Sequence, residues 1–187
     1  MNILKEILDW VLHIAGAVAA ALVIVIFIAQ PTHVRGISME PTYHNADQIL
    51  INKLPHTFRT GFEYGDVVII DSRTDRTRTL KDDILDTLRY NLVTYKLFGI
   101  EQEHYWVKRV IGMPGDVLEY RDGKLYRNNV LLNEHYIKEQ MEYFPGKVTV
   151  PKDCLFVMGD NRNASMDSRE IGCIPIDHVI ARVLLKF

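Results

Sequence analysis

The sequence predicts a mainly β domain behind one N-terminal transmembrane helix, with one further helix inserted at residues 80–98. Three features indicate this: a long uncharged segment near the N-terminus, short apolar runs separated by turn residues, and one segment with helical spacing of leucines. The 187 residues are 48% hydrophobic and 25% charged, as is usual for a globular domain. The net charge of -2 provides no basic surface for nucleic acid, so no nucleic-acid partner is expected.

The first element is a membrane anchor over residues 10–29. Residues 14–29 read IAGAVAAALVIVIFIA, and His13 is the only interruption back to Trp10. A helix of this length spans about 30 Å, the thickness of the hydrocarbon core. A buried core helix is the first alternative, but a small domain rarely buries a helix that is apolar on every side. A cleaved signal peptide is the second, but cleavage after Ala29 would place the large Phe27 at -3.

The anchor divides the chain into three parts. Residues 1–9 are expected to be a short cytoplasmic tail, 10–29 the transmembrane anchor, and 30–187 a β-rich domain outside the cytoplasm. Lys5 and the amino terminus are opposed by Glu6 and Asp9, so the positive-inside rule only slightly favours a cytoplasmic N-terminus.

The domain is predicted to consist of short strands. Apolar runs bounded by turn residues place them at 48–52, 66–71, 105–111, 117–120, 124–126, 130–132, 154–158 and 178–187. Asp122-Gly123 between two of these runs is a strong hairpin signal.

The inserted helix is predicted from apolar residues at helical spacing, which are Leu80, Ile84, Leu85, Leu88, Leu92 and Tyr95. Thr79 with Asp82 can form a capping box, and Gly99 can end the helix. Two interpretations of the apolar face stay open. It packs on the β domain, as most amphipathic helices do, or it lies in the membrane interface. In the second case the basic cluster of Arg73, Arg76, Arg78 and Lys81 would meet anionic headgroups.

Two residues suggest nucleophilic chemistry. The scattered histidines and two cysteines have no metal-ligand spacing, so no metal site is predicted. Ser38 lies nine residues beyond Ala29, within about 30 Å of the membrane even if the chain is fully extended. Lys108 stands in an apolar strand, where it either extends its amine to water or is desolvated between Trp106 and Val110. Desolvation would lower its pKa, and a neutral lysine can act as the base for a serine.

A dense polar segment, GDNRNASMDSR at residues 159–169, follows the 154–158 strand. It is either a surface loop with Asx turns or a functional loop on a rigid scaffold. Cys154 and Cys173 flank this loop. A disulfide between them and two free thiols are both left open, because their separation cannot be read from the sequence.

Taken together, these segments resemble the bacterial type I signal peptidases, in the short form typical of Gram-positive bacteria. GISMEPT, YGDVVI, YWVKRVIGMPGD and MGDNRNASMDSREIG occur in that family's order behind an anchor, from about Trp10 to Cys173. The resemblance implies a domain of two antiparallel sheets outside the cytoplasm. It also implies cleavage of signal peptides after small residues at -3 and -1, without cofactor or metal. Exported preproteins and the lipid bilayer are the implied partners, and the secretion translocase is a further candidate.

The resemblance also implies residue roles. It makes Ser38 the nucleophile and Lys108 the general base. It makes Ser165 the residue that orients the lysine amine, Asp160 a structural aspartate, and Asp167 and Arg169 a supporting pair. Several Gram-negative members have a hydroxyl residue two places before the nucleophile, where this chain has Gly36. The oxyanion would then depend on backbone N–H groups, that of Ser38 first.

Two other functions are weighed against a signal peptidase. A membrane-tethered β domain could bind exported chains without cutting them. Self-cleaving transcriptional repressors share a Ser/Lys dyad, but they need a DNA-binding N-terminus and an internal Ala-Gly cleavage site. Here the only Ala-Gly is Ala15-Gly16, inside the anchor.

Overall fold

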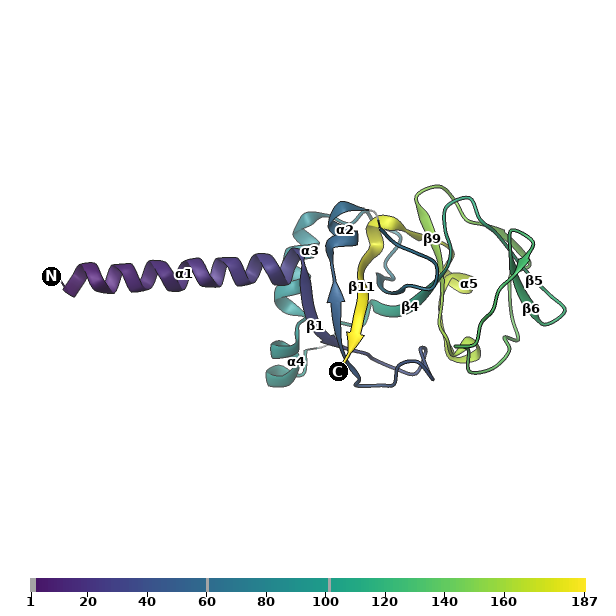
Figure 1. The fold of residues 1–187 in the computed structure, drawn as a ribbon, viewed down its shortest axis with the longest axis horizontal. Coiled ribbons are helices and arrows are strands. Elements are labelled where there is room, and N and C mark those ends of the chain that lie inside the picture. Colours follow the sequence, from purple (N-terminus) through teal and green to yellow (C-terminus); the bar gives the residue numbers. More distant parts are fainter. Residues whose placement is uncertain (1–2, 60, 101) are drawn as a thin grey trace.

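A single long helix stands out from a β domain in the computed structural model, which describes residues 3–59, 61–100 and 102–187 (Figure 1). This helix, α1 (Ile3–Phe27), is long and apolar enough over Lys5–Phe27 to cross a membrane, with mean hydropathy 2.5 and no buried residue in its span. Its exposure rules out the buried core helix. The helix ends two residues before the expected boundary at 29, because Ala29 already pairs with Asn52 in the first strand.

The larger of two sheets has seven antiparallel strands. In spatial order they are β1 (Ala29–His33), β2 (Gln48–Asn52), β11 (Val179–Lys186), β3 (Val67–Asp71), β4 (Tyr105–Gly112), β9 (Cys154–Met158) and β10 (Ile174–Pro175). The strand β1, which contains Pro31, was not predicted from the sequence. A proline is tolerated there because β1 is an edge strand.

The smaller sheet lies at the end of the domain farthest from α1 (Figure 1). Its order is β7 (Val130–Leu131), β6 (Lys124–Arg127), β5 (Val117–Arg121) and β8 (Lys147–Thr149). Asp122 and Gly123 both have positive φ, 52° and 73°, as a two-residue hairpin turn requires. A mainly β fold of two antiparallel sheets behind one apolar helix is therefore confirmed.

The central strands are buried on both faces, and this fixes the position of β4. In β3, Val67 and Ile69 pack into one apolar cluster, whereas Val68 and Ile70 pack into a second cluster on the opposite face. A third cluster, which includes Ile111 of β4, joins the two sheets. Most side chains of β4 are therefore buried.

The single helix predicted over 80–98 is wrong in one respect, because it is two helices, α3 (Leu80–Arg89) and α4 (Leu92–Phe98). Asn91 causes the break. Its side-chain oxygen accepts from the N–H groups of Val93 and Thr94, and its amide donates to the Leu88 carbonyl. Asn91 therefore caps the C-terminal end of α3 and the N-terminal end of α4. The predicted capping box holds, since the Thr79 N–H donates to Asp82 at 2.9 Å.

The remaining described helices are short. They are α2 (Leu54–Phe58), α5 (Ser168–Ile171) and two 3-10 turns at Arg162–Ala164 and Ile176–His178. Both α2 and α3 lie at the end of the domain from which α1 emerges (Figure 1).

Candidate active site

Ser38 and Lys108, which are 70 residues apart in the sequence, are in direct contact. Lys108 Nζ lies 2.9 Å from Ser38 Oγ and donates a hydrogen bond to it. Ser38 belongs to the loop between β1 and β2 and is partly exposed. The next residue, Met39, is buried in the core and fixes the loop against the sheet. The structure therefore brings together the two residues that the sequence singled out.

Lys108 is enclosed, and only 3% of its surface is exposed. Burial lowers the pKa of its amine to about 8, against a smaller opposing effect of the Asp167 carboxylate. The Trp106 ring centre lies 5.6 Å from Nζ. Of the two interpretations of Lys108, desolvation is the one that the structure supports. The amine is poised to be neutral for an appreciable fraction of the time near neutral pH.

The polar loop after β9 holds the backbone of Ser38. The Asn161 N–H donates to the Ser38 carbonyl at 3.0 Å, and the Asn161 side-chain amide donates to the Ile37 carbonyl at 3.1 Å. Buried backbone carbonyls need such partners. The segment 159–169 is thus not a free surface loop, because it holds the turn that carries Ser38.

Asp160 links three parts of the site. It is fully buried, and Arg109 binds it in a bidentate pair, with Nε and Nη2 at 2.8 and 2.6 Å. Thr42 Oγ1 donates to the same carboxylate at 2.5 Å. The lysine strand, the serine loop and the 159–169 loop are therefore joined through one carboxylate. Bidentate charged hydrogen bonds of this kind are among the strongest in proteins.

Asp167 organises the other side of the loop. It accepts from the Gly159 N–H, from Ser165 Oγ and from Arg169 Nε, each at 2.9 Å. Arg169 also donates to the Ser165 carbonyl at 3.3 Å. The Ser165 hydroxyl donates its only hydrogen to Asp167, so the lone pairs of its oxygen can still accept a hydrogen bond from another donor. The role in orienting the Lys108 amine stays a prediction.

Gly159 lies at a close approach of two segments that was not predicted from the sequence. A Cβ there would collide with Ser165 Oγ and would lie 2.5 Å from the Ser38 carbonyl oxygen. Only glycine lets these two segments approach so closely. The buried ion pair of Arg162 with Glu134, at 2.6 Å, was not predicted either. The one available signal for Gly159 was its position between a buried strand and the polar loop.

A groove of about 270 Å³ opens beside the pair. Its lining residues are Arg35, Ser38, Gln102, Glu103, Tyr105, Trp106, Val107 and Lys108. The strand β9 pairs with β4 only from Arg109 onward. Among the described residues, the earlier half of β4 therefore has a ladder partner on one side only, in β3. An unpaired strand edge next to a groove can accept an extended peptide.

The backbone N–H of Ser38 is available to a ligand, since no described residue accepts a hydrogen bond from it. Gly36 has φ of +82°, and its N–H donates to Asn45 at 2.9 Å. The left-handed conformation at Gly36 shapes the turn that presents Ser38.

Cys154 and Cys173 are both free thiols and half buried. Of the two alternatives left open by the sequence, the structure has the unbridged form. Burial raises the pKa of the Cys173 thiol to about 11, which makes it a poor nucleophile at neutral pH.

Comparison with known proteins gives one family. The chain matches the family described as signal peptidase, peptidase S26, over residues 7–187. It is 32% identical to Signal peptidase I P of Bacillus subtilis subsp. natto, in an alignment that covers 88% of this chain and 80% of that protein. It is 31% identical to thylakoidal processing peptidase 1, chloroplastic, of Arabidopsis thaliana, over 86% of this chain but only 42% of that longer relative.

A crystal structure of a signal peptidase I from Enterococcus faecalis V583 is 26% identical, with a TM-score of 0.45, and covers 67% of this chain and 98% of that one. The family match extends over nearly the whole chain, including the serine loop, the lysine strand and the polar loop. The chain therefore belongs to the signal peptidase family, peptidase S26.

Proposed function

We propose that this protein is a membrane-anchored signal peptidase I, a serine endopeptidase that removes signal peptides from exported preproteins through a Ser38/Lys108 dyad. Family membership supplies the reaction class. The observation that carries the assignment of the dyad is the 2.9 Å hydrogen bond between Ser38 Oγ and a buried lysine whose pKa is lowered to about 8. A serine alcohol is a weak nucleophile until a neighbouring base takes its proton.

The first half of the reaction forms an acyl-enzyme. Neutral Lys108 takes the proton of Ser38 Oγ while the oxygen bonds to the scissile carbonyl carbon. The Ser38 N–H donates to the oxyanion that develops. The carbon–nitrogen bond then breaks, and the ammonium of Lys108 passes its proton to the leaving amine, which is the new N-terminus of the mature protein.

The second half regenerates the enzyme. Lys108, neutral again, takes a proton from a water molecule that attacks the ester carbon. The bond from carbon to Ser38 Oγ breaks, and the proton returns to the serine. In this scheme Ser165, Asp167 and Arg169 position the lysine, and Asp160 positions the serine loop through Thr42.

Substrate selection follows from the groove. The stretch before the cleavage site would pair as a strand with the open edge of β4, in the β-augmentation mode. Trp106 and Tyr105 are among the residues that line the groove next to the dyad. We expect the groove to favour small side chains at -1 and -3, because a larger side chain would meet these aromatic rings.

The proposed topology places α1 in the bilayer, the N-terminus in the cytoplasm and the domain from about residue 30 on the opposite side. The exposed apolar surface of Lys5–Phe27 supports membrane insertion. The partners are then preproteins and lipid, with the secretion translocase as a further candidate. The chemistry uses only side chains and backbone, so it needs no metal or cofactor.

The proposal is tested with the full chain in detergent micelles and a synthetic signal peptide that carries an Ala-x-Ala cleavage site. We expect cleavage after the second alanine, located by mass spectrometry, and its loss in Ser38→Ala. A protein that binds the peptide but leaves it intact would instead be the non-catalytic tethered domain. Cleavage that persists in Ser38→Ala would overturn the dyad.

A further inference from the structure

Most apolar side chains of the helices α3 and α4 point away from the domain. Six of these side chains, between 46% and 72% exposed, form what we call the apolar face: Leu80, Leu85, Leu88, Val93, Leu97 and Phe98. A helix that packs on its own domain normally does the reverse. The simpler interpretation left open by the sequence, packing on the β domain, therefore does not account for this face.

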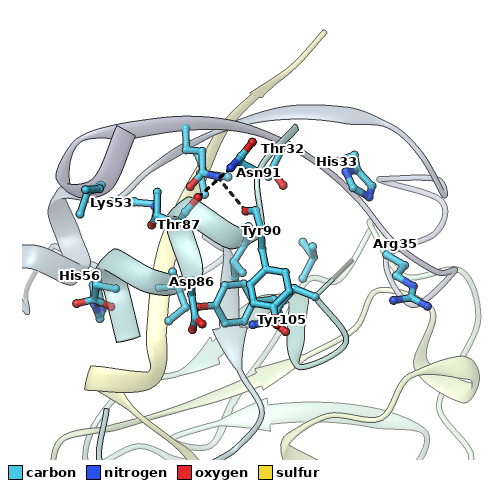
Figure 2. A pocket seen from close by; sticks show the side chains of 18 of the residues that line it. Thr32, His33, Arg35, Lys53, His56, Asp86, Thr87, Tyr90, Asn91 and Tyr105 are labelled. Carbon is cyan, nitrogen blue, oxygen red and sulfur yellow. Dashed lines mark hydrogen bonds and ion pairs between the residues drawn. The ribbon is translucent and has the colours of Figure 1, made fainter. Parts of the chain in front are cut away.

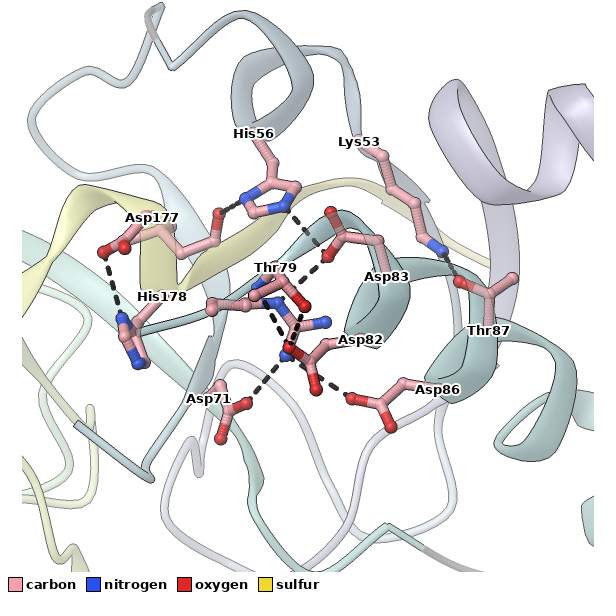
Figure 3. A network of polar contacts seen from close by, with 12 residues as sticks. Lys53, His56, Asp71, Thr79, Asp82, Asp83, Asp86, Thr87, Asp177 and His178 are labelled. Atoms are coloured by element: carbon pink, nitrogen blue, oxygen red, sulfur yellow. Dashed lines mark hydrogen bonds and ion pairs between the residues drawn. The ribbon is translucent and has the colours of Figure 1, made fainter. Parts of the chain in front are cut away.

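The side of α3 that faces the domain is polar. Thr87 accepts from Lys53 Nζ at 2.8 Å, and Asp83 contacts His56 at 3.2 Å and Arg78 at 3.0 Å (Figure 3). Asp86 accepts from Tyr105 OH at 2.7 Å. Hydrogen bonds and ion pairs thus hold the helix on the domain, and its apolar face is left for another partner.

The apolar face lies where the anchor ends. The side chain of Gln30, three residues beyond α1, donates to the carbonyl of Tyr90 between α3 and α4 at 3.2 Å. Thr57 of α2 donates to the Phe27 carbonyl at 3.1 Å. Residues of α1 and α3 also approach within 8 Å of each other, measured between Cα atoms, so α3 lies beside the anchor. Figure 1 shows both helices beside this end of α1, and Figure 2 shows Tyr90 and Asn91 among the residues that line a pocket there.

The exposed charges of the two helices all have one sign. Lys81, Arg89 and Lys96 are exposed, whereas the three aspartates of α3 are turned toward the domain. One part of the sequence-based hypothesis is corrected here. Arg78 is enclosed between Asp71 and Asp83, and Arg73 and Arg76 are paired with aspartates as well. Those three arginines do not supply the contact with anionic headgroups; the three exposed cations are placed to do so.

We propose that α3 and α4 form a membrane-docking surface that lies in the interface of an anionic bilayer. The apolar face enters the boundary of the acyl chains, and Lys81, Arg89 and Lys96 contact lipid phosphates. The bilayer is the occupant because it surrounds α1 at the level of this face; the inference rests on the membrane anchoring of the proposed function. Anchor and docking surface together fix the height and tilt of the Ser38 groove above the membrane.

The test uses the full chain in vesicles of phosphatidylcholine and phosphatidylglycerol. Cys154 and Cys173 are replaced by serine, and a spin label is placed on a single cysteine introduced at Leu97, at Val18 in the anchor or at Lys124 in the smaller sheet. Oxygen concentrates in the acyl chains, whereas a water-soluble nickel complex stays outside the membrane. We therefore expect oxygen to relax the labels at 18 and 97 more strongly than the nickel complex does. At 124 we expect the nickel complex to have the stronger effect. A label at 97 that behaves like the one at 124, while 18 is immersed, overturns the docking surface. A water-exposed label at 18 overturns the anchoring instead.

A second experiment measures cleavage without any label, because a spin label could itself disturb the helix. Val93→Glu with Leu97→Glu is compared with Val130→Glu, which changes an equally exposed valine in the smaller sheet. We expect the double variant to lose about tenfold in cleavage of a membrane-inserted preprotein, because the groove is misplaced relative to its substrate, and to cleave a short soluble peptide normally. Val130→Glu should change neither. The proposal would be overturned if the double variant changed the cleavage of the two substrates, relative to the wild type, by the same factor. It would also be overturned if position 97 were immersed only when other membrane proteins are added.

Discussion

Two buried lysines of this protein make the same local contact in very different places. Lys108 Nζ lies 2.9 Å from Ser38 Oγ, and Lys53 Nζ lies 2.8 Å from Thr87 Oγ1. Burial lowers the pKa of each amine to about 8. By hydrogen bond and pKa alone, the two pairs could not be told apart.

The difference lies in access to the hydroxyl. Ser38 is partly exposed, and its groove measures about 270 Å³. Thr87 is 6% exposed in the interior of α3, and its pocket, shown in Figure 2, measures about 80 Å³. A peptide can reach the first hydroxyl and not the second. Burial lowers the pKa of any enclosed lysine, so a dyad is identified by an approachable nucleophile and not by its base.

The surroundings of the two lysines differ as well. The carboxylates of Asp83 and Asp86 lie near Lys53 and belong to the helix that Lys53 fastens (Figure 3). The carboxylate that acts most strongly on the Lys108 amine is that of Asp167, which is itself hydrogen-bonded to Ser165 and Arg169. We infer that the first pair fastens α3 to the domain and that the second is arranged for reaction.

The largest expected effect separates the two lysines directly. Lys108→Met and Lys53→Met both replace a buried amine by an unbranched apolar chain. On a soluble Ala-x-Ala peptide we expect kcat/KM to fall about ten-thousand-fold in Lys108→Met, as when other dyad and triad members are removed. It should change less than about threefold in Lys53→Met.

Lys108→Arg should be as inactive as Lys108→Met, because a guanidinium stays protonated at any working pH. Comparable losses in Lys108→Met and Lys53→Met would mean that the first acts through folding and not through the chemistry. Circular dichroism of each variant checks that the fold is kept.

The next effect concerns how closely the scaffold approaches the dyad. Gly159→Ala places a methyl group against Ser165 Oγ and the Ser38 carbonyl. We expect about a hundredfold loss of kcat/KM, because displacing a reacting group by about 1 Å can cost that much.

The matched control is Gly112→Ala. This glycine also lies in a crowded place, with Val150 Cγ2 2.9 Å and Leu118 Cδ1 3.0 Å from the position of an added Cβ, but its neighbours belong to the core between the sheets. It should lower the melting temperature and leave kcat/KM of the folded enzyme nearly unchanged. Similar kinetic losses in both variants would contradict a specific role of Gly159.

The pH profile sharpens the comparison at the level of the base. The neutral fraction of an amine with a pKa of about 8 rises about tenfold per pH unit below that value and then levels off. We expect kcat/KM on the soluble peptide to follow this curve. Lys53→Met should keep the same midpoint, since the second lysine takes no part. A profile that falls with rising pH, or a midpoint that moves in Lys53→Met, would assign the ionisation to another group.

Much of the fold could be predicted because apolar patterning fixes buried strands. Residues 48–52 and 154–158 are strands over those exact bounds. The break at Asn91 was missed because the apolar spacing continues through it, and only the local hydrogen bonds of its side chain favour two helices over one. The orientation of α3 was left open for a related reason. Spacing shows that a helix has an apolar side but not which side the domain covers, and here ion pairs decide it.

The site was only partly accessible from the sequence. Ser38 and Lys108 stood out because a lysine in an apolar strand needs an explanation, and the resemblance to a family supplied one. The bidentate pair of Arg109 with Asp160 and the contact of Gly159 with Ser38 could not be derived, since they depend on which segments meet in space. Alternation along a strand places the neighbours Lys108 and Arg109 on opposite faces, but in the structure both are largely enclosed.

The smallest expected effect is on stability, and it uses the pH dependence of Lys53. Its pKa is about 8 in the folded protein and near the ordinary value of 10.5 in the unfolded chain. Between these values the unfolded state binds more protons, so the free energy of unfolding rises with pH; below about 8 both states are protonated and the contribution is flat. Lys53→Met lacks this contribution, whereas Lys108 and the tyrosines contribute equally to both proteins. In urea unfolding of detergent-solubilised protein, we expect the wild type to gain about 1 kcal/mol over Lys53→Met between about pH 8 and 9, within the limit of about 1.4 kcal/mol per pH unit for one group. If the difference in the free energy of unfolding between the two proteins did not change with pH, the Lys53 amine would be hydrated in solution. The two lysines would then share the geometry of their hydrogen bonds but not a lowered pKa.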